Sequence, residues 1–389
     1  GGDGVMAKLG EVCTIVSGST PKTSVTSYWD GNTKWITPAE LNEDTFYIMD
    51  SVRHITEEGK EKTGLSYLPT GTVILSSRAP IGKTAIAGCE MCCNQGFKNL
   101  ICSDAIYNEY LYFFLKSKTD YLNSLGRGAT FKEISKSIVE SIEIPLPEVN
   151  QQKEIAEKFK KLEQLISLRK QQLAKLDELV KARFVEMFGD AKLNPNNLPC
   201  CSLSEYIVFL TSGSRGWSQY FTDSGEYFIT IKNVKNCKIT LQDVQCVTPP
   251  DNAEAKRTRV QENDLLISIT ADLGRTGIVT KEIAEHGAYI NQHLTCIRLK
   301  QDKLNPLYVA YYMESDAGKE QFIAKNQSAV KAGLNFNAIN SLKLMVPPLS
   351  LQNEFAAFVE RVDQQKQTVQ QSLEKLELMK KALMQEYFG

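Results

Sequence analysis

The stretch LAKLDELVKARFVEMFG, residues 173–189, returns two hundred residues later as LEKLELMKKALMQEYFG, residues 373–389, and this repetition decides the fold. Setting residues 142–189 against 342–389 without a gap gives 14 identical pairs in 48 positions. Each copy follows a proline-containing stretch, IEIPLP or LKLMVPP, and proline stops a strand from continuing. Each copy ends at glycine, the usual residue past a helix C-terminus. The sequence therefore predicts one long helix in each half of an internal repeat.

Within each copy the apolar residues step by four and three, which is the spacing of a coiled-coil seam. A helix of about 36 residues would be about 54 Å long at 1.5 Å per residue, far longer than the mean globular helix. We expect the two helices to pack on each other, because their seam positions are complementary. Arg169 in the first copy corresponds to apolar Val369 in the second, whereas apolar Ile166 and Val180 correspond to Lys366 and Lys380. The alternative is two unrelated amphipathic helices, each lying on its own domain. The predicted seam residues are Ile155, Phe159, Leu162, Ile166, Leu173, Leu176, Phe355, Val359, Val362, Leu373 and Leu376.

The repeat continues, more faintly, into the regions before the helices. LSSRAPIGKTAIA (75–87) aligns with ISITADLGRTGIV (267–279), CNQGFKNLIC (93–102) aligns with INQHLTCIRL (290–299), and VSGSTPKTS (16–24) echoes TSGSRGWSQ (211–219). Short β-branched runs such as GTVILSS, KTAIAG and DLLISIT predict strands, while NEYLYFFLKSK and NPLYVAYYMES predict helices. The predicted architecture is α+β, with two similar globular domains and two long helices. Its boundaries are 6–150 for the first domain, 151–189 for the first helix, 190–350 for the second domain and 351–389 for the second helix.

Composition sets the broad class of the protein. A chain of 389 residues favours two or more domains, and 42% apolar with 23% charged residues is typical of a soluble globular protein. No apolar run approaches the roughly 18 residues that a membrane span needs, so we expect no membrane association and a cytoplasmic protein. Of the ten cysteines only Cys89 and Cys92 form a CxxC pair, without a second pair to complete a zinc site. We expect reduced, packed thiols and no metal.

Motifs for catalysis are missing from the sequence. The string SRAPIGKT (77–84) ends like a phosphate-binding loop, but Ser77 stands where that loop needs its first glycine. The chain has only three histidines, no glycine-rich dinucleotide motif, no defensible pair of catalytic acids, and no Asn-Pro-Pro-Phe-type string of adenine methyltransferases. We therefore predict a protein that is not an enzyme and needs no cofactor.

The order of features resembles the specificity (S) subunit of Type I restriction-modification systems. The resemblance rests on SGSTP (17–21), the Trp-Ile-Thr-Pro run (35–38), IEIPLP (142–147), QQKEIA (151–156) and the Phe-Gly ending of each helix, and it covers the chain from Met6 onward. It implies two target recognition domains, an antiparallel coiled coil, and sequence-specific binding of double-stranded DNA. It also implies two methyltransferase (M) subunits as partners, with restriction (R) subunits joining through the core of two M subunits and one S subunit.

A duplication whose helices pair antiparallel gives one chain a pseudo-two-fold axis, as a homodimer has by symmetry. Because the two domains differ in sequence, the DNA site is expected to consist of two unlike half-sites at a fixed separation. The near-neutral charge, 14 basic against 15 acidic residues in 6–141 and 15 against 15 in 200–341, means that only local clusters can contact phosphates.

We predict that DNA contacts come from loop residues of both domains. Gln95 suits an adenine edge, and Arg78 or Arg215 suits a guanine edge. The Asn-Gln pairs 94–95 and 291–292 occur in both domains, which fits backbone capping as well as base reading. The candidates are Ser19, Thr20, Lys22, Arg78, Lys83, Gln95, Arg127, Thr130 and Lys132 in the first domain, and Ser214, Arg215, Trp217, Lys232, Arg275, His293, Lys325 and Lys331 in the second. An alternative function is a coiled-coil adaptor whose two domains bind proteins or peptides and no DNA.

Overall fold

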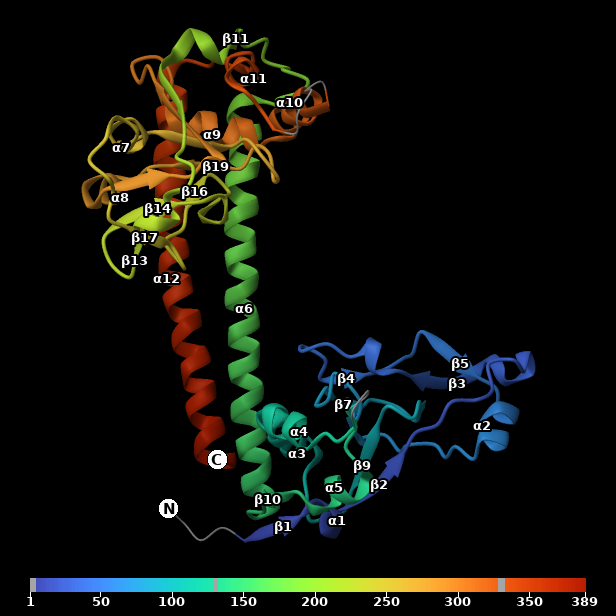
Figure 1. Ribbon diagram of the computed structural model, residues 1–389. Helices are drawn as coiled ribbons and strands as arrows, with labels where there is room; N and C mark the ends of the chain where they lie inside the picture. Colours follow the sequence, from blue (N-terminus) through green and yellow to red (C-terminus); the bar gives the residue numbers. More distant parts are fainter. Residues whose placement is uncertain (1–4, 129–131, 328–332) are drawn as a thin grey trace. The chain divides into compact units, whose positions relative to one another are not determined.

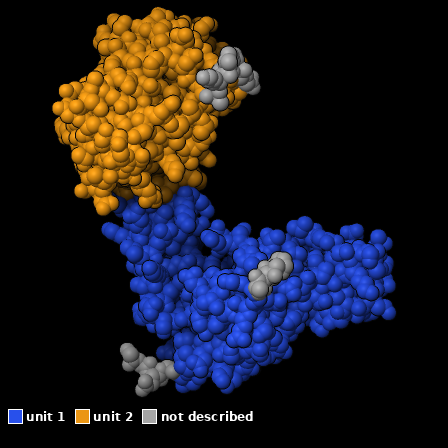
Figure 2. All heavy atoms as spheres, in the orientation of Figure 1, with its two compact units in different colours: residues 1–171, 370–389 blue, residues 172–369 orange. Residues whose placement is uncertain are grey.

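The computed structural model describes residues 5–128, 132–327 and 333–389. The chain divides into two compact units, coloured separately in Figure 2: unit 1 holds residues 1–171 and 370–389, and unit 2 holds residues 172–369. We call the part of unit 1 that precedes the first long helix domain 1, and the part of unit 2 between the long helices domain 2.

Two helices of 40 residues each, labelled α6 (Val149–Phe188) and α12 (Leu349–Phe388) in Figure 1, occupy the repeated stretches. They begin two residues earlier and end one residue earlier than the predicted ranges 151–189 and 351–389. Both helices supply residues to both units, because the division between the units falls within each of them. Among the residues that the structure describes, no helix combines the length and the apolar character that crossing a membrane requires.

Domain 1 is built on two sheets with helices packed against them. Its larger sheet has the order β2 (Cys13–Ser17), β9 (Lys98–Cys102), β6 (Val73–Leu75), β7 (Thr84–Ala87) and β4 (Tyr47–Ile48), and its smaller sheet has the order β5 (Arg53–Ile55), β3 (Trp29–Ile36) and β8 (Cys92–Cys93). A third pair joins β1 (Met6–Lys8) to β10 (Glu143–Pro145). The helices are α1 (Leu9–Val12), α2 (Glu57–Thr63), α3 (Asn108–Ser117), α4 (Thr119–Leu125) and α5 (Lys136–Ser141).

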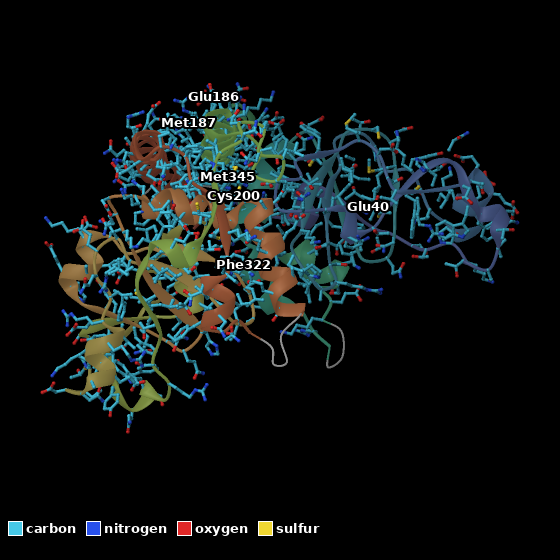
Figure 3. The ribbon with its side chains drawn as sticks, turned by 90° about the horizontal axis from the view of Figure 1, so that it is seen from above. Glu40, Glu186, Met187, Cys200, Phe322 and Met345 are labelled. Atoms are coloured by element: carbon cyan, nitrogen blue, oxygen red, sulfur yellow. The ribbon has the colours of Figure 1, made fainter. Side chains whose placement is uncertain are left out.

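Domain 2 repeats this plan. Its first sheet has the order β12 (Ile207–Ser212), β21 (Leu294–Leu299), β18 (Leu265–Ser268) and β19 (Thr276–Ile278), and its second has β13 (Phe221–Thr222), β17 (Gln245–Val247), β14 (Glu226–Ile229) and β20 (Ala288–Ile290). Two strand pairs follow, β11 (Cys200–Ser202) with β22 (Lys343–Met345) and β15 (Val234–Lys235) with β16 (Lys238–Ile239). The helices are α7 (Ala253–Thr258), α8 (Lys281–His286), α9 (Pro306–Glu314), α10 (Asp316–Gln327) and α11 (Phe336–Asn340). Phe322 and Met345, labelled in Figure 3, belong to its core.

The two domains share most of their sheet topology, so the internal repeat is structural as well as sequential, although the two main sheets have five and three strands in domain 1 and four each in domain 2. The antiparallel order β2-β9-β6-β7 corresponds to β12-β21-β18-β19. In the second sheet of each domain an inner strand, β3 or β14, has one antiparallel and one parallel neighbour. The strands predicted within 71–77, 83–88 and 264–270 are confirmed as β6, β7 and β18, and the helices predicted at 108–118 and 305–315 are confirmed as α3 and α9. The α+β class is therefore confirmed.

A buried glutamine joins the start of each long helix to its domain. The Gln152 side chain is fully buried, accepts a hydrogen bond from Tyr107 N at 2.8 Å, and donates to the carbonyl oxygens of Ala105 at 3.0 Å and Pro147 at 2.8 Å. Gln352, two hundred residues later, is also fully buried and accepts from Asn305 N at 2.8 Å. These contacts satisfy backbone groups that burial would otherwise leave without partners, which explains why the repeat retains a glutamine at this position.

Within each unit the long helices run antiparallel. In unit 1, Lys158 Nζ donates to the Tyr387 hydroxyl at 2.9 Å, and Lys380 Nζ pairs with Glu163 at 2.8 Å. In unit 2, Lys366 pairs with Asp177, and Arg183 pairs with Glu354 at 3.0 Å. Partner numbers fall along α12 as they rise along α6, which fixes the antiparallel direction. The alternative of two helices that each lie only on their own domain is therefore wrong.

The predicted seam residues differ in how deeply they lie in these helix pairs. Leu173, Leu176 and Leu376 are half-buried. The others are buried: Ile155, Phe159, Leu162, Ile166, Phe355, Val359, Val362 and Leu373. Burial is deepest where a domain also packs on the helix pair, because the core of each unit joins domain residues with residues from both long helices.

Candidate nucleic-acid interface

Sheet topology brings three loops together at one end of the β2-β9-β6-β7-β4 sheet in domain 1 and at the same end of the equivalent β12-β21-β18-β19 sheet in domain 2. In domain 1, β2 and β6 end at this edge while β9 and β7 begin there, since β2 and β6 are both antiparallel to β9, and β7 is antiparallel to β6. The loops are 17–21, 76–83 and 94–97 in domain 1, and 212–216, 268–275 and 291–293 in domain 2. Segments 132–135 and 333–335 lie beside them, through hydrogen bonds from Ile134 N to Ser77 O at 2.9 Å and from Leu334 N to Ile269 O at 2.8 Å.

Close backbone contact explains the repeated Ser-Gly-Ser sequence. A Cβ on Gly18 would overlap the carbonyl oxygen of Asn94, and a Cβ on Gly213 would overlap that of Asn291. Only glycine allows this approach of two loops. Ser19 N then donates to Cys93 O at 3.0 Å, which anchors the first loop on the second. The equivalent hydrogen bond in domain 2 runs from Ser214 N to Ile290 O at 2.8 Å.

In each Asn-Gln pair the asparagine stabilises the loop, and the glutamine contacts a side chain of the neighbouring loop. The Oδ1 atom of Asn94 accepts from Gly96 N at 2.9 Å, and that of Asn291 accepts from His293 N at 3.2 Å, so both asparagines stabilise the turn of their own loop. The exposed Gln95 accepts a hydrogen bond from the Thr20 hydroxyl, whereas Gln292 accepts one from Arg215 Nε. The same backbone therefore presents Thr-Gln in domain 1 and Arg-Gln in domain 2.

The third loop, 76–83 in domain 1 and 268–275 in domain 2, also has the same backbone hydrogen bonds but different side chains in the two domains. The Ser76 hydroxyl donates to Pro80 O at 2.7 Å and accepts from Lys83 N at 2.9 Å. In domain 2 the Ser268 hydroxyl donates to Asp272 O and accepts from Arg275 N at 2.8 Å. These serines close equivalent loops across their base. The second residue past each serine differs: it is Arg78 in domain 1 and Thr270 in domain 2.

The structure brings most of the domain 1 candidates to this loop edge. Ser19, Thr20 and Gln95 lie in contacting loops, and the exposed Arg78 is joined to them because Ser77 N donates to Gly96 O at 2.8 Å. Lys22, Arg127 and Lys132 are exposed. Lys83 is half-buried, and its Nζ donates to Pro38 O at 3.1 Å. Thr130 lies outside the described residues.

Domain 2 gathers a smaller set. Arg215 and His293 meet through Gln292, whose Nε2 lies 3.3 Å from His293 Nε2, and Thr270 Oγ1 lies 2.6 Å from His293 Nδ1. Lys232 is exposed, Arg275 pairs with Asp272, Lys325 Nζ donates to Ser341 Oγ at 2.7 Å, and Lys331 lies outside the described residues.

Two candidates of domain 2 prove to be core residues. Ser214 is 2% exposed, and its hydroxyl lies 3.1 Å from that of Thr258. Trp217 is 3% exposed, stacks on Phe228 with ring centroids 5.7 Å apart, and donates from Nε1 to Glu254 at 3.2 Å. Neither side chain has a face open to DNA, so we leave both out of the interface. The sequence did not reveal their burial, because it depends on strands and helices distant in the chain.

Sequence reasoning missed Lys98 and Glu133 in domain 1 and Gln292 and Thr270 in domain 2. The Asn-Gln repeat could have identified Gln292, because Gln95 was already a candidate at the equivalent position. Lys98 and Glu133 carry no sequence signal. Glu133 accepts from Arg78 Nε at 3.2 Å and from Lys98 Nζ at 3.1 Å, although 55 and 35 residues separate them in the chain.

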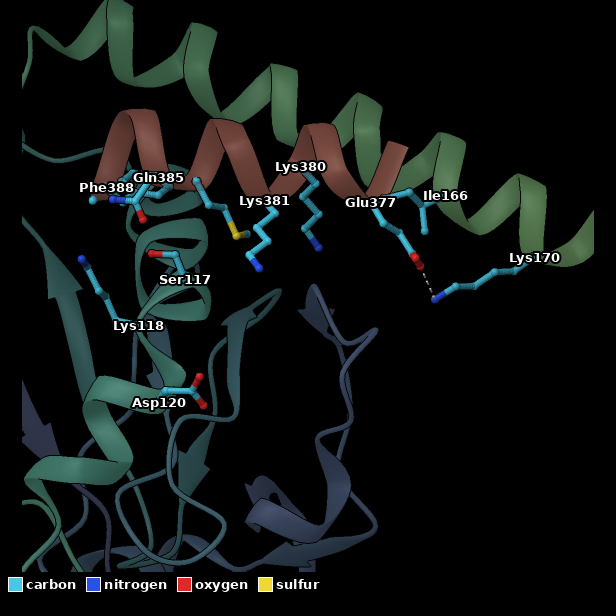
Figure 4. Close-up of a pocket in the computed structure, with 12 residues that line it drawn as sticks. Ser117, Lys118, Asp120, Ile166, Lys170, Glu377, Lys380, Lys381, Gln385 and Phe388 are labelled. Carbon is cyan, nitrogen blue, oxygen red and sulfur yellow. Dashed lines mark ion pairs between the residues drawn. The ribbon is translucent and has the colours of Figure 1, made fainter. Parts of the chain in front are cut away.

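A cleft of about 510 Å³ in unit 1 lies between the start of α4 and the two long helices (Figure 4). Two of its lysines form ion pairs across the long helices: Lys170 pairs with Glu377 at 3.9 Å, and Lys380 pairs with Glu163 at 2.8 Å. These pairs account for the two lysines as contacts between α6 and α12, and we assign no reaction to the cleft. Among the residues that the structure describes, no three His, Cys, Asp or Glu side chains gather as a metal site would require.

Comparison with known families decides what this architecture is. The profile of the Type I restriction modification DNA specificity domain matches residues 3–178 and 217–378, well over half of the chain. The chain belongs to this family. Its two matched segments correspond to the two halves of the internal repeat.

Individual relatives carry the same description. The chain is 38% identical over 186 residues to the Type I restriction enzyme MjaIX specificity subunit of Methanocaldococcus jannaschii, an alignment that covers 47% of the chain and 43% of the relative. This match therefore spans less than half the length of that relative. It is 24% identical over 383 residues to the EcoKI specificity subunit of Escherichia coli (strain K12), which covers 92% of the chain and 82% of the relative.

Known structures show the same fold. The S subunit of the Type I restriction-modification system from M. genitalium matches with a TM-score of 0.60 at 14% identity, over 100% of this chain and 96% of that one. A chain from a study of complex assembly and conformational transition of the Type I restriction-modification system matches with a TM-score of 0.63 at 18% identity, over 100% and 98%. The expected class of two similar α+β domains with paired long helices is thus confirmed.

Proposed function

We propose that this chain is the DNA-binding specificity subunit of a Type I restriction-modification complex. In this role each domain reads one half of a bipartite, asymmetric DNA site. The chain itself transfers no methyl group and cuts no DNA. It positions two methyltransferase subunits, and restriction subunits join through the resulting core.

The main observation behind this proposal is that three loops have the same backbone hydrogen bonds in both domains but hold different side chains. The Ser-Gly-Ser loop, the Asn-Gln loop and the serine-closed loop have matching hydrogen bonds in both domains. Thr20 with Gln95 in domain 1 corresponds to Arg215 with Gln292 in domain 2. A glutamine amide suits adenine, and an arginine suits guanine. Two such domains would read unlike half-sites.

The charge of the chain agrees with local rather than global attraction to DNA. The formal net charge is -1, so phosphate contacts have to come from individual exposed basic side chains, such as Lys22, Arg127 and Lys132 in domain 1. Each phosphate neutralised by a lysine or arginine makes affinity fall more steeply with salt. We expect a moderate salt dependence, matching a small number of phosphate contacts.

The test is selection of bound duplexes from a random-sequence pool by the full chain, alone and with its methyltransferase subunits, at several salt concentrations. Selection of two constant half-sites separated by a constant spacer supports the proposal. Arg215→Ala should relax the half-site of domain 2 alone. Lys281→Ala is a matched control, because Lys281 follows β19 at the opposite end of the sheet and is exposed. Absence of any duplex binding, even with methyltransferase subunits, would favour the protein-binding adaptor instead.

The catalytic part of the proposal has a separate test. Incubation of the pure chain with S-adenosylmethionine and site-containing duplex should give no methyl transfer, and addition of methyltransferase subunits should give transfer at the selected site. Methyl transfer by the pure chain would contradict a non-catalytic role.

A further inference from the structure

Three charged side chains form a connected group at the loop edge of domain 1. Glu133 accepts from Arg78 Nε through Oε2 at 3.2 Å and from Lys98 Nζ through Oε1 at 3.1 Å. Lys98 is 7% exposed and lies beneath the loop, where its Nζ also reaches Ser77 Oγ at 3.4 Å. Arg78 is outermost, with 45% of its side chain exposed. The group therefore runs from a buried ammonium to an exposed guanidinium.

The backbone of Glu133 is fixed independently of its side chain. Arg127 N donates to Glu133 O at 3.0 Å, Glu133 N donates to Arg127 O at 3.0 Å, and the next residue, Ile134, donates from its N to Ser77 O at 2.9 Å. The carboxylate thus extends from a hydrogen-bonded segment toward the 76–83 loop. Because it engages only Nε of Arg78, the two terminal nitrogens of the guanidinium have no partner among the described residues.

Such an arrangement suits base recognition. Arginine reads guanine by donating two hydrogen bonds to O6 and N7 in the major groove. A side chain as long as arginine loses conformational freedom on binding, and a carboxylate that holds Nε beforehand reduces that cost. Arg78 also lies beside the Gln95 loop, so the base that it would reach neighbours the one that Gln95 would reach.

Domain 2 shows that the group is not needed for the fold. The positions equivalent to Arg78, Lys98 and Glu133 are Thr270, Thr295 and Gly333, so all three charges are absent together. The backbone frame around them is retained. Ile269 N donates to His293 O at 3.0 Å and Leu334 N to Ile269 O at 2.8 Å, which repeats the contacts of Ser77 and Ile134. All three charged residues are replaced together while the backbone hydrogen bonds around them are kept. This indicates that the three residues serve recognition of DNA rather than folding of the domain.

We infer that domain 1 reads a guanine through Arg78, and that Glu133 and Lys98 are positioning residues that hold its guanidinium for this contact. This inference rests on the proposed function. It assigns guanine recognition through an arginine at this loop to one half-site only, because the equivalent residue of domain 2 is Thr270, paired with His293.

The experiment selects duplexes from a random pool with the full chain and its methyltransferase subunits, and compares base preferences position by position. Four variants are needed: Arg78→Lys, Arg78→Ala, Glu133→Gln, and the triple variant Arg78→Thr with Lys98→Thr and Glu133→Gly. Arg78→Lys retains the positive charge but loses the pair of parallel N–H donors that a guanidinium offers to guanine. Glu133→Gln retains one oxygen acceptor for Arg78 and Lys98. The triple variant places the residues of domain 2 on a frame that already tolerates them, which guards against misfolding.

The wild type should select a guanine in one half-site, and both Arg78 variants should reduce that preference about five-fold or more. Glu133→Gln should weaken the same preference without lowering affinity for random duplex, because it removes a negative charge near the phosphates. The triple variant should match Arg78→Ala, with the other half-site unchanged in every case.

Three results would overturn the inference and leave the proposed function standing: a selected site without a guanine in the domain 1 half, unchanged preference in Arg78→Ala, or an effect of Glu133→Gln spread over both half-sites. An Arg78 effect without any Glu133 effect would overturn the positioning role. Failure of the wild type to select any sequence would instead count against the proposed function itself.

Discussion

The ring of Phe388, the last residue of α12, stacks on that of Phe159 in the first part of α6, with centroids 5.6 Å apart and planes 17° apart. The Phe388 ring also contacts that of Tyr110 of α3, with ring centroids 5.3 Å apart, so Phe388 belongs to the core of unit 1. Two hundred residues earlier, Phe188 meets Phe355 at 5.6 Å and Tyr308 of α9 at 4.8 Å in unit 2. Each long helix ends in a phenylalanine that binds a domain and the start of the other helix.

Loss of either terminal ring should therefore destabilise the protein strongly. Phe388→Ala and Phe188→Ala should each lower the free energy of unfolding by about 3 to 5 kcal/mol, since both rings are at most 2% exposed. Chemical denaturation followed by circular dichroism measures this. Leu168→Ala is a matched control on α6, because Leu168 is 49% exposed and should change stability by less than about 0.5 kcal/mol. Equal effects of the buried and exposed changes would contradict this account.

The buried glutamine at the start of α6 should be nearly as important as the ring. Gln152→Ala leaves Tyr107 N and the carbonyl oxygens of Ala105 and Pro147 without their partner, and each buried unsatisfied group costs about 1 to 3 kcal/mol. The neighbouring Gln151 is exposed, so Gln151→Ala is a control of the same chemistry. Thermal unfolding should separate the two variants clearly, and similar melting temperatures would show that water replaces the amide.

Acid should weaken the charged group of domain 1. Desolvation alone would raise the pKa of Glu133, but hydrogen bonds and charges from Lys98 and Arg78 hold it below its ordinary value. A lowered folded-state pKa stabilises the protein above the unfolded value of about 4.3, and this stabilisation is lost as the pH falls through the folded value. Between about pH 5 and pH 3, the wild type should therefore lose stability more steeply than Glu133→Gln. Parallel pH profiles of unfolding free energy would contradict the ion pairs.

The two long helices could be predicted because their apolar residues follow a regular local spacing. The four-and-three spacing and the flanking Pro and Gly placed both long helices within two residues of their observed ends. The loop frame could be anticipated only in part. Gly18 and Asn94 were visible as repeated residues, but their contact depends on the pairing of β2 with β9, which joins residues more than eighty positions apart.

Individual side chains were harder to place, for a physical reason. Trp217 and Arg215 stand two residues apart in the chain, yet Trp217 is buried and Arg215 is exposed, because Trp217 packs against Phe228 and Tyr289. Similarly, Glu133 gains its role only when the 76–83 loop folds against it. Loop residues follow no period, so sequence alone cannot tell an exposed polar side chain from a satisfied core one.

The cysteines should differ sharply in reactivity. Burial is the main cause that raises the pKa of Cys92 to about 11 and that of Cys93 to about 12, so almost no thiolate is present near pH 8. Cys200 is exposed at the start of β11. Brief treatment of the native chain with iodoacetamide should modify Cys200 and leave Cys92 and Cys93 unmodified until denaturant is added. Peptide mass spectrometry measures the modification at each cysteine. Early modification of Cys93 would show that the β8 region opens readily.

The repeat predicts what half of the molecule would do. In unit 1, residues 370–389, nearly all of them in α12, complete the core, and residues 172–189 are the repeat equivalents of 372–389. A chain that ends at Gly189 lacks the first set but exposes the second, including Phe188. The 172–189 segment of another copy is therefore the nearest substitute for the missing helix, with its Phe188 in the place of Phe388 beside Phe159.

Two such half-chains should pair antiparallel into a symmetric dimer, since each supplies the helix end that the other lacks. The fit is imperfect. Lys380, which pairs with Glu163 at 2.8 Å, would be replaced by Val180, whereas Glu377 opposite Lys170 would be replaced by Asp177 and keep its charge. We expect dimers at micromolar concentrations or weaker, measured by sedimentation. Because both copies of domain 1 would then be identical, duplexes selected by the dimer should be palindromic, including at the base that we propose Arg78 reads. A stable monomer, or a dimer that selects a non-palindromic site, would show that the two helix repeats are not interchangeable.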